Sequence, residues 1–258
     1  MSIKALIPAR AGSVRVKNKN VRPFAGSTLL EVKVRQLMRI KELDGVIVNS
    51  ESDEILEIAR ALGAETVKRA DYFASSTVSI NEVYRNIAEN FDADVMVYAN
   101  CTNPLLKDES ICSCLQAFSE MPCEFDSLNT AHLIKEFLWL DGKAINYDPT
   151  RMPKSQNLPD ILALNFAVNI IRRADILASG SIVGRHPRLF PISQMEATDI
   201  DNECDFIFAE TIYGQHSPCH GEVDMVDYPM DSLGCYCSYA RFFQAGWLEP
   251  HAPRKRGL

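Results

Sequence analysis

Strand-like runs and amphipathic segments alternate along the first 120 residues. Runs at residues 3–8, 45–49, 65–68 and 94–99 are short, rich in β-formers and bounded by turn residues, which is typical of buried parallel strands. Residues 27–43, 52–62, 79–91 and 108–121 carry apolar side chains at helical spacing. The alternation predicts right-handed βαβ units in an open, mostly parallel α/β sheet flanked by helices.

Residues that commonly begin or end helices support this assignment. Ser27 or Thr28 is a suitable cap for the first helix, and Ser52-Asp53 for the second, which Gly63 would end. Asp205 to Tyr213 predicts a last clear helix, after a short one at residues 174–178.

The pattern changes at about residue 126. Residues 137–140 and 143–147 flank Asp141-Gly142 and predict a small β-hairpin, and residues 161–171 predict a buried strand. We therefore expect one domain over residues 1–214, with an insertion at about 126–160. Residues 215–258 lack periodicity and are expected to form an irregular tail whose role the sequence does not define.

Composition excludes several classes of protein. The chain is 47% apolar and 24% charged, which is ordinary for a soluble domain with a core, and its net charge of −7 argues against an extended nucleic-acid surface. No run approaches the length of a membrane span, and the chain reaches Pro8 and Arg10 too early for a signal-peptide core. We therefore expect a cytoplasmic protein that binds neither nucleic acid nor membrane.

The eight cysteines are expected to be reduced thiols. Cys112 and Cys114 lie in a predicted helix, where an i,i+2 pair points to different faces. A late cluster does not have standard zinc spacing, so we favour small packed thiols over a metal site there; it consists of Cys219, His220, Cys235 and Cys237. His132, His186 and His251 are expected to have structural or surface roles.

The loop after the first strand is the first candidate for chemistry, because ligands of open parallel sheets bind at the carboxyl ends of strands. Arg10, Arg15, Lys17 and Lys19 lie within ten residues, and Gly12 allows close approach of backbone N–H groups. This pattern suits a polyphosphate, although it matches neither common phosphate-loop motif. From composition alone, a solvated charged loop is the simpler interpretation.

Five ordered motifs resemble the CMP-sugar-acid synthetases, the acylneuraminate cytidylyltransferase family. The first is I-P-A-R-A-G-S at residues 7–13 with K-N-V at 19–21, which resembles I-P-A-R-x-G-S and K-N-(I/L). Residues 49–65 are similar to the family's second strand and helix, and residues 69–77 to its base-binding loop. Residues 102–105 are similar to its Q-P-T-S-P-L turn, and residues 199–210 to its acidic motif. Together they span residues 3 to about 213.

The resemblance implies a nucleotide-diphospho-sugar transferase type of fold and the transfer of CMP from CTP to a 2-keto sugar acid, with Mg²⁺ as cofactor. It implies catalytic roles for Arg10, Lys19 and Asp201, and metal ligation by Asp199 and Asp201. In a strand, the i,i+2 spacing of these two aspartates would put both carboxylates on one face; the alternative is that they cap the helix at 205–213. The remaining CTP contacts that it implies are Ala9, Gly12, Ser13, Arg15, Asn20, Arg69, Ser75 and Ser79.

The acceptor half of the implied site departs from the family pattern. The resemblance implies acceptor contacts from Asn100, Thr102 and Asn165, and from Arg151 and Lys154 across a homodimer interface that the insertion makes. Val14 stands in place of the loop Lys. In the segment usually read F-R-P-N-G-A, the carboxylate-binding Arg is Ala163 and the Gly is Phe166.

Two explanations of this departure stay open. Another cation, Arg151, Lys154 or Arg172, takes over the acid, or the acceptor is a relative of sialic acid: a legionaminic, pseudaminic or ketodeoxyoctonate-type sugar, or a phosphonate. A binding or scaffold protein that has lost turnover is the alternative to an enzyme.

Overall fold

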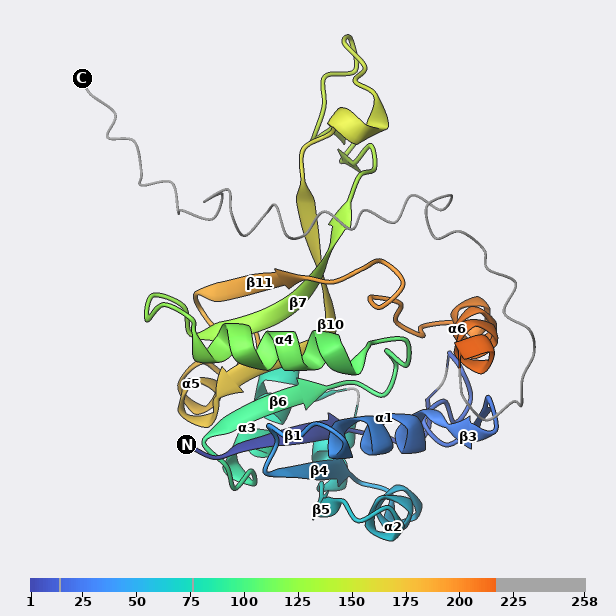
Figure 1. Ribbon diagram of the computed structural model, residues 1–258, viewed down its shortest axis with the longest axis vertical. Helices are drawn as coiled ribbons and strands as arrows, with labels where there is room; N and C mark the ends of the chain where they lie inside the picture. The colour runs from blue at the N-terminus through green and yellow to red at the C-terminus, as the bar shows by residue number, and fades with distance from the viewer. Residues whose placement is uncertain (14, 76, 217–258) are drawn as a thin grey trace. The chain divides into compact units, whose positions relative to one another are not determined.

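One seven-stranded sheet organises the computed structural model, which describes residues 1–13, 15–75 and 77–216 (Figure 1). The strand order is β11-β7-β10-β6-β1-β4-β5, and β10 is the one antiparallel strand of this sheet. The strands are β1 (Ile3–Pro8), β4 (Gly45–Ser50), β5 (Glu65–Lys68), β6 (Val95–Ala99), β7 (Ser127–Ile134), β10 (Ile161–Arg172) and β11 (Pro187–Pro191). The predicted open, mostly parallel α/β sheet is confirmed.

Helices cover both faces of the sheet. One hydrophobic cluster joins the sheet to α1 (Leu29–Met38), α2 (Asp53–Ala61), α4 (Asp108–Ser119) and α6 (Glu203–His216). A second cluster on the other face joins it to α3 (Ile80–Glu89) and α5 (Arg173–Ser179). Each predicted helix is present, with ends that differ by a few residues.

The predicted helix starts agree with the caps. The Thr28 side chain accepts from the Glu31 N–H at the start of α1, and Ser52 accepts from Ile55 at the start of α2. Helix α1 ends at Met38 rather than Leu43, since residues 41–43 form a turn. Before it, β2 (Pro23–Phe24) and β3 (Ser27–Thr28) form a short antiparallel pair.

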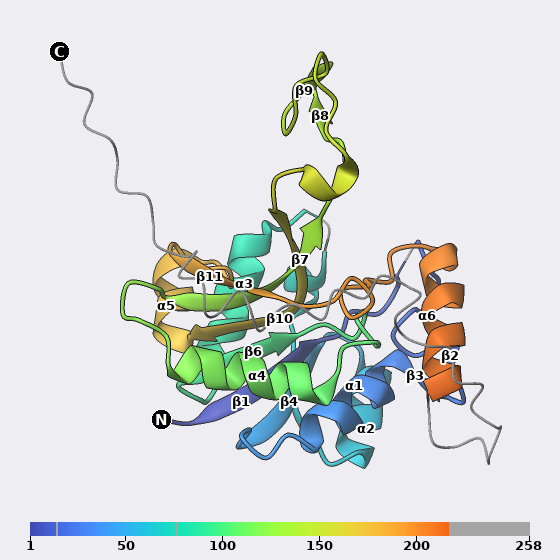
Figure 2. The same ribbon diagram turned by 45° about the horizontal axis from the view of Figure 1, so that its top comes forward.

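Strands β7 and β10 continue into an arm, residues 135–160, that rises beyond the sheet (Figures 1 and 2). The expected hairpin is there as β8 (Trp139–Leu140) and β9 (Lys143–Ala144). Residues 127–134, which fall within the expected insertion of about 126–160, pair within the main sheet as β7. Polar residues, Ser127, Asn129 and Thr130, interrupt the apolar pattern of this segment, and the sequence did not predict β11 either.

Strand β10 has an irregularity in its middle. Its pairing with β7 shifts between Leu164 and Asn169, and Phe166 has a φ of 54° in between. A bulky side chain rarely adopts this left-handed conformation, and glycine does so freely. A glycine, the residue that the family pattern has at this position, would adopt the conformation of Phe166 without strain.

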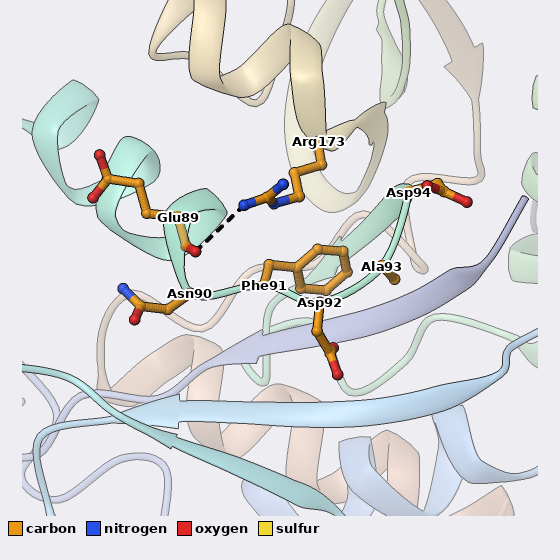
Figure 3. A pocket seen from close by; sticks show the side chains of 7 residues that line it. All are labelled: Glu89, Asn90, Phe91, Asp92, Ala93, Asp94 and Arg173. Atoms are coloured by element: carbon orange, nitrogen blue, oxygen red, sulfur yellow. Dashed lines mark hydrogen bonds between the residues drawn. The ribbon is translucent and has the colours of Figure 1, made fainter.

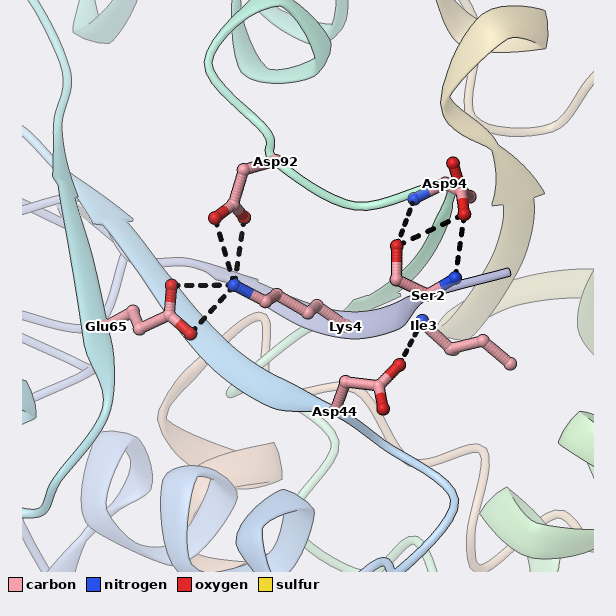
Figure 4. Close-up of polar contacts among 7 residues, drawn as sticks. All are labelled: Ser2, Ile3, Lys4, Asp44, Glu65, Asp92 and Asp94. Atoms are coloured by element: carbon pink, nitrogen blue, oxygen red, sulfur yellow. Dashed lines mark hydrogen bonds and ion pairs between the residues drawn. The ribbon is translucent and has the colours of Figure 1, made fainter.

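The amino-terminal edge of the parallel strands is acidic and closed by internal contacts. Lys4 lies between the carboxylates of Glu65 and Asp92, at 2.9 and 3.0 Å (Figure 4). A shallow hollow of about 460 Å³ on this edge is lined by residues 89–94 and Arg173, whose guanidinium donates to the Ala88 and Glu89 carbonyls at the end of α3 (Figure 3). These charges complete helix and strand ends, at the edge of the sheet opposite the predicted site.

The tail predicted for residues 215–258 lies outside the described residues beyond His216, as do Val14, Ser76, His251 and the late Cys and His cluster. Within the described part of the chain, Cys101, Cys112, Cys114, Cys123 and Cys204 are free thiols. In this described part, every helix is too short or too polar to cross a membrane.

Candidate functional site

The loop after β1 is fastened to the end of β4. The Ala9 N–H donates to the Asn49 carbonyl at 3.0 Å, and the Ala11 N–H donates to Glu51 Oε1 at 2.7 Å. Gly12 follows with a φ of 68°. Within the described residues, the N–H groups of Gly12 and Ser13 have no hydrogen-bond partner, so they remain available to an anion. Ala9, by contrast, has already used its N–H.

Arg10 and Asn20 form one side of the candidate site. The Arg10 guanidinium donates to the Ala74 carbonyl at 3.2 Å, and Asn20 Nδ2 donates to the Arg10 carbonyl at 3.1 Å. Both residues line a small hollow of about 50 Å³ next to the start of α2. This volume is far below that of a typical ligand pocket, so the hollow is one corner of a site rather than a whole nucleotide pocket.

Arg69 is buried beside this corner. Its guanidinium donates to the side chain of Asn49 at 2.6 Å and to the Asn49 carbonyl at 2.9 Å. Burial lowers its pKa, while Tyr98 and Glu51 act in the opposite direction and Arg10 adds to the lowering. Arg69 and Arg10 are therefore two cations that repel each other, an arrangement that a bound anion relieves.

Lys19, Arg15 and the two aspartates form the other side of the site. The Lys19 ammonium donates to the Ile200 carbonyl, and Arg15 pairs with the Asp201 carboxylate at 2.8 Å. Burial lowers the pKa of Lys19, and the charges of Asp199 and Asp201 oppose that shift. The cationic loop and the acidic motif thus meet, although about 180 residues separate them in sequence.

Asp199 carries an electrostatic cost. Loss of solvation among the surrounding protein atoms raises its pKa, and the Asp201 charge raises it further, while the Thr102 side chain, Lys19 and Arg15 partly offset this. Two carboxylates that disfavour each other's charge form a donor set suited to a hard divalent cation that keeps several waters. No group of three or more His, Cys, Asp or Glu side chains with metal-binding geometry occurs among the described residues. Other ligands would have to come from phosphate or water.

The alternative role of the aspartates, helix capping, is filled by their neighbours. Asn202 Oδ1 accepts from the Asp205 N–H at 3.1 Å, and Asp205 Oδ2 accepts from the N–H groups of Asp201 and Asn202. The side chains of Asp199 and Asp201 take no part in this cap. The expected strand is wrong, however, since both residues lie in the loop that leads into α6.

The two sides of the site are neighbours in the chain. Asn20, which holds the Arg10 carbonyl, directly follows Lys19. The small hollow includes Arg10 and Asn20, and neither Lys19 nor the aspartates line it. The candidate site lies at the carboxyl ends of the parallel strands.

Asn165 lies where β10 approaches the end of β6. Its Oδ1 accepts from the Thr130 hydroxyl at 2.7 Å and from the Ala167 N–H at 3.1 Å, which fixes the amide group. The side chain is 7% exposed, and its Nδ2 is buried without a partner among the described residues. Asn100, the other predicted amide, donates to the Phe166 carbonyl at 3.1 Å. Asn165 therefore presents an unsatisfied donor at this end of the sheet.

The residue at the family's arginine position has a histidine opposite it. Ala163 pairs with His132 across β10 and β7, so both side chains lie on the same face of the sheet. His132 Nδ1 is buried and has no partner among the described residues. The sequence predicted a structural or surface role for His132, because nothing in its local pattern indicates which residue a neighbouring strand will place beside it.

Of the cations suggested as substitutes for the missing arginine, Arg172 is not available. It pairs with Val95 at the far end of β10, and its guanidinium contacts Asp175 at 3.5 Å. Arg151 and Lys154 are exposed on the arm. Among the described residues of one chain, the side chain directly opposite Ala163 is therefore His132 and not one of these three cations.

Two serines predicted to bind CTP have different surroundings. The Ser79 hydroxyl forms a capping box with Glu82 at the start of α3. Ser75 Oγ lies 3.0 Å from Thr77 Oγ1, next to the Ala74 carbonyl that Arg10 binds. A structural role therefore accounts for Ser79, and Ser75 lies nearer to the cations.

The fold is that of nucleotidyltransferases. The structure of a CMP:2-keto-3-deoxy-manno-octonic acid synthetase complexed with CTP aligns with a TM-score of 0.65 at 14% identity, covering 84% of this chain and 100% of that chain. A 4-diphosphocytidyl-2C-methyl-D-erythritol synthase from Anaerococcus prevotii aligns with a TM-score of 0.60 at 16% identity, covering 82% and 97%. At these identities the likeness concerns the fold.

The family of the chain is shown by its sequence. Residues 4–150, more than half of the chain, match the cytidylyltransferase family, and the chain belongs to it. The post-translational flagellin modification protein B of Campylobacter coli is 27% identical, over 81% of this chain and 93% of its own length. A 3-deoxy-manno-octulosonate cytidylyltransferase of Chlorobium phaeovibrioides is also 27% identical, over 77% and 82%. The N-acylneuraminate cytidylyltransferase of Oncorhynchus mykiss is 26% identical over 81% of this chain, which spans about half of that longer protein.

Proposed function

We propose that the protein transfers CMP from CTP to the anomeric hydroxyl of a 2-keto sugar acid and releases pyrophosphate. The hydroxyl oxygen attacks the α-phosphorus, the bond from that phosphorus to the oxygen bridging it to the β-phosphorus breaks, pyrophosphate leaves with that oxygen, and the hydroxyl proton passes to water. The supporting observation is the meeting of Lys19 and Arg15 with Asp199 and Asp201, at the carboxyl edge of a cytidylyltransferase sheet. Relatives that act on 3-deoxy-manno-octulosonate and on acylneuraminate support this acceptor class.

The nucleotide half of the mechanism follows from the loop after β1. Arg10 and Lys19 neutralise the triphosphate, and the free N–H groups of Gly12 and Ser13 hold its oxygens. Asn20 and Arg69 orient the cytidine half, with Ser75 near the base. In-line displacement at phosphorus needs mainly positioning and charge stabilisation, and these groups supply both.

Asp199 and Asp201 are the residues that would hold Mg²⁺. When bound, the ion neutralises charge that develops on the phosphate oxygens. Arg15 pairs with Asp201, and the raised pKa of Asp199 is consistent with a pair of carboxylates that a bound cation would stabilise.

The acceptor half is formed by β6, β7 and β10. Asn100, Thr102 and Asn165 are its proposed polar contacts, and the partnerless Asn165 Nδ2 supports this. His132 takes the place opposite Ala163 and faces the acid group.

We propose a homodimer that forms through the arm. Trp139, Leu140 and Met152 are 55%, 62% and 60% exposed, an unusual number of large apolar side chains for so short a segment. A second copy would cover them, and Arg151 and Lys154 would then lie within reach of the partner's acceptor site.

The decisive experiment is a panel of eight- and nine-carbon keto sugar acids and small phosphonates, each incubated with CTP and Mg²⁺ and followed by pyrophosphate release. We expect release with at least one keto sugar acid and none in its absence. Release only with a phosphonate would change the acceptor class. CTP binding by calorimetry, without release from any acceptor, would identify a protein that has kept the fold and lost turnover.

A further inference from the structure

Lys33 is a lysine at the centre of the hydrophobic layer between α1 and the sheet. Its side chain is 0% exposed. The ammonium donates to Gln36 Oε1 at 2.7 Å and to the Asn103 carbonyl at 3.0 Å. Among the described residues, no carboxylate lies within ion-pair distance of it.

This position costs free energy. A buried ammonium without an ion-pair partner loses solvation that two neutral hydrogen bonds do not restore, and a leucine would suit the same helix face. A residue that is expensive to bury and contacts a functional loop is a candidate for a role beyond packing. Lys33 contacts the turn after β6, which runs from Cys101 to Pro104.

A series of hydrogen bonds leads from Lys33 to the acidic loop. Its first acceptor is the backbone of Asn103, whose side-chain Nδ2 donates to the Thr198 carbonyl at 3.1 Å. The preceding residue, Thr102, accepts the Ile200 N–H at 2.9 Å. Both bonds end on residues that flank Asp199, and Lys19 holds the Ile200 carbonyl from the other side.

Gln36 strengthens the same connection. One helical turn after Lys33, it accepts from the ammonium and donates to the Leu106 carbonyl at 2.6 Å and to Asp108 at 3.0 Å. Helix α1 is therefore hydrogen-bonded to both ends of the segment from Asn103 to Asp108.

We propose that Lys33 is a positioning residue: through the turn of residues 101–104 it fixes the loop of Asp199 and Asp201 in the arrangement that receives the metal and triphosphate. This proposal rests on the function proposed above. It assigns to a core residue, which touches no substrate, the task of keeping two repelling carboxylates close together before a cation binds.

The two hydrogen bonds that Lys33 donates do not depend on the charge of its side chain. The groups that face the ammonium are the Cys101 thiol, the Asn103 carbonyl, the Gln36 amide and, further off, Asp108. Burial lowers the pKa of Lys33 to about 8 and raises that of Cys101 to about 12. A neutral amine keeps two N–H groups, as many as the two acceptors require.

The test compares Lys33→Met with Arg173→Met, in protein without metal or nucleotide. Each change removes a side-chain donor from a backbone carbonyl, but Arg173 lies at the opposite edge of the sheet (Figure 3). Hydrogen exchange is followed for peptides over 198–202 and over the end of α3. We expect Lys33→Met to speed exchange of the Ile200 amide by about tenfold, as for the loss of one buried hydrogen bond, and Arg173→Met to speed exchange only at α3. Unchanged exchange at Ile200 in a folded Lys33→Met protein would overturn the proposal.

Asn103→Ser gives the same test at the next link if Lys33→Met does not fold. It removes the bond to Thr198 and leaves the backbone acceptor of Lys33 in place. We expect faster exchange at 198–202, and exchange equal to wild type would overturn the proposal.

Activity separates this inference from the proposed function. In Lys33→Met the Mg²⁺ concentration for half-maximal pyrophosphate release should rise about tenfold, with little change in the KM for CTP. A wild-type protein that is inactive with every acceptor would refute the proposed function, and the exchange experiment would still decide the role of Lys33.

Discussion

At the scale of single residues, the site is marked by polar groups that the fold leaves unsatisfied. The Gly12 and Ser13 N–H groups, Asn165 Nδ2 and His132 Nδ1 lack partners among the described residues, and Asp199 has a raised pKa. All of them lie at the carboxyl end of the parallel strands or in the loops that follow. Asn165 Nδ2 and His132 Nδ1 are buried and are therefore costly in the free protein, and a ligand that bonds to them would offset that cost.

Asp201 gives the first prediction. Asp201→Asn keeps the shape of the side chain and removes one carboxylate of the proposed metal pair. We expect the rate of pyrophosphate release to fall by about 10²-fold or more, because charge stabilisation in such sites is worth several kcal/mol. The unfolding free energy should change by about 1 kcal/mol or less, since the Arg15–Asp201 ion pair is exposed. An unchanged rate at saturating Mg²⁺ would remove Asp201 from the mechanism.

Lys33 gives a prediction about pH. Its pKa of about 8 in the folded protein lies below the ordinary value of 10.5, so the unfolded chain binds more protons between these two values. The unfolding free energy of wild type should therefore rise relative to Lys33→Met as pH increases from 8 to 10, by about 3 kcal/mol at most. Urea unfolding of both proteins at several pH values measures this. A constant difference between the two would show that Lys33 has an ordinary pKa.

At the scale of elements, the capping residues separate structure from binding. Ser79→Ala removes the capping box of α3 and should lower the unfolding free energy by about 1 kcal/mol without changing the KM for CTP. Ser75→Ala, close to Arg10, is the matched variant: it should raise that KM with little loss of stability. If Ser79→Ala raised the KM for CTP as much as Ser75→Ala does, Ser79 would have to be regarded as a CTP-binding residue.

The sequence predicts elements well where local pattern and tertiary packing agree. The strands on both sides of β1 are apolar because both faces are buried, and the helices between them carry clear caps. Strand β7 was missed because both of its faces are buried and yet hold polar side chains, Asn129 and Thr130, whose partners come from the loop before β11 and from β10. The likeness of Asp199 and Asp201 to a strand failed for the same reason, since their loop is shaped by Thr102 and Asn103 rather than by its own residues.

The approach of the cationic loop to the acidic motif could be expected from the sequence, whereas the surroundings of Ala163 could not. Arg10, Lys19 and the acidic motif occur in an ordered set of motifs, and the roles that the resemblance implies for them stay predictions. His132 and Lys33 belong to no motif. Their significance depends on cross-strand pairing and on burial, which a single sequence does not display.

At the scale of the whole molecule, the arm gives a prediction about assembly. Trp139→Glu together with Leu140→Glu places charge on its exposed apolar tip. We expect sedimentation to show a dimer for wild type and a monomer for the variant, with nearly unchanged thermal stability of the sheet. An equal mass for both proteins would place the subunit contact elsewhere.

The strand order also has a consequence for synthesis on the ribosome. Strands β1, β4, β5 and β6 and the loop after β1 are complete once about 100 residues have emerged. Until β10 is synthesised, some 60 residues later, β6 is an exposed edge strand that can pair wrongly with other nascent chains. The cationic loop after β1 is thus made well before the acidic loop of Asp199 and Asp201, and the newborn chain is most vulnerable to aggregation while residues 100–172 are being translated.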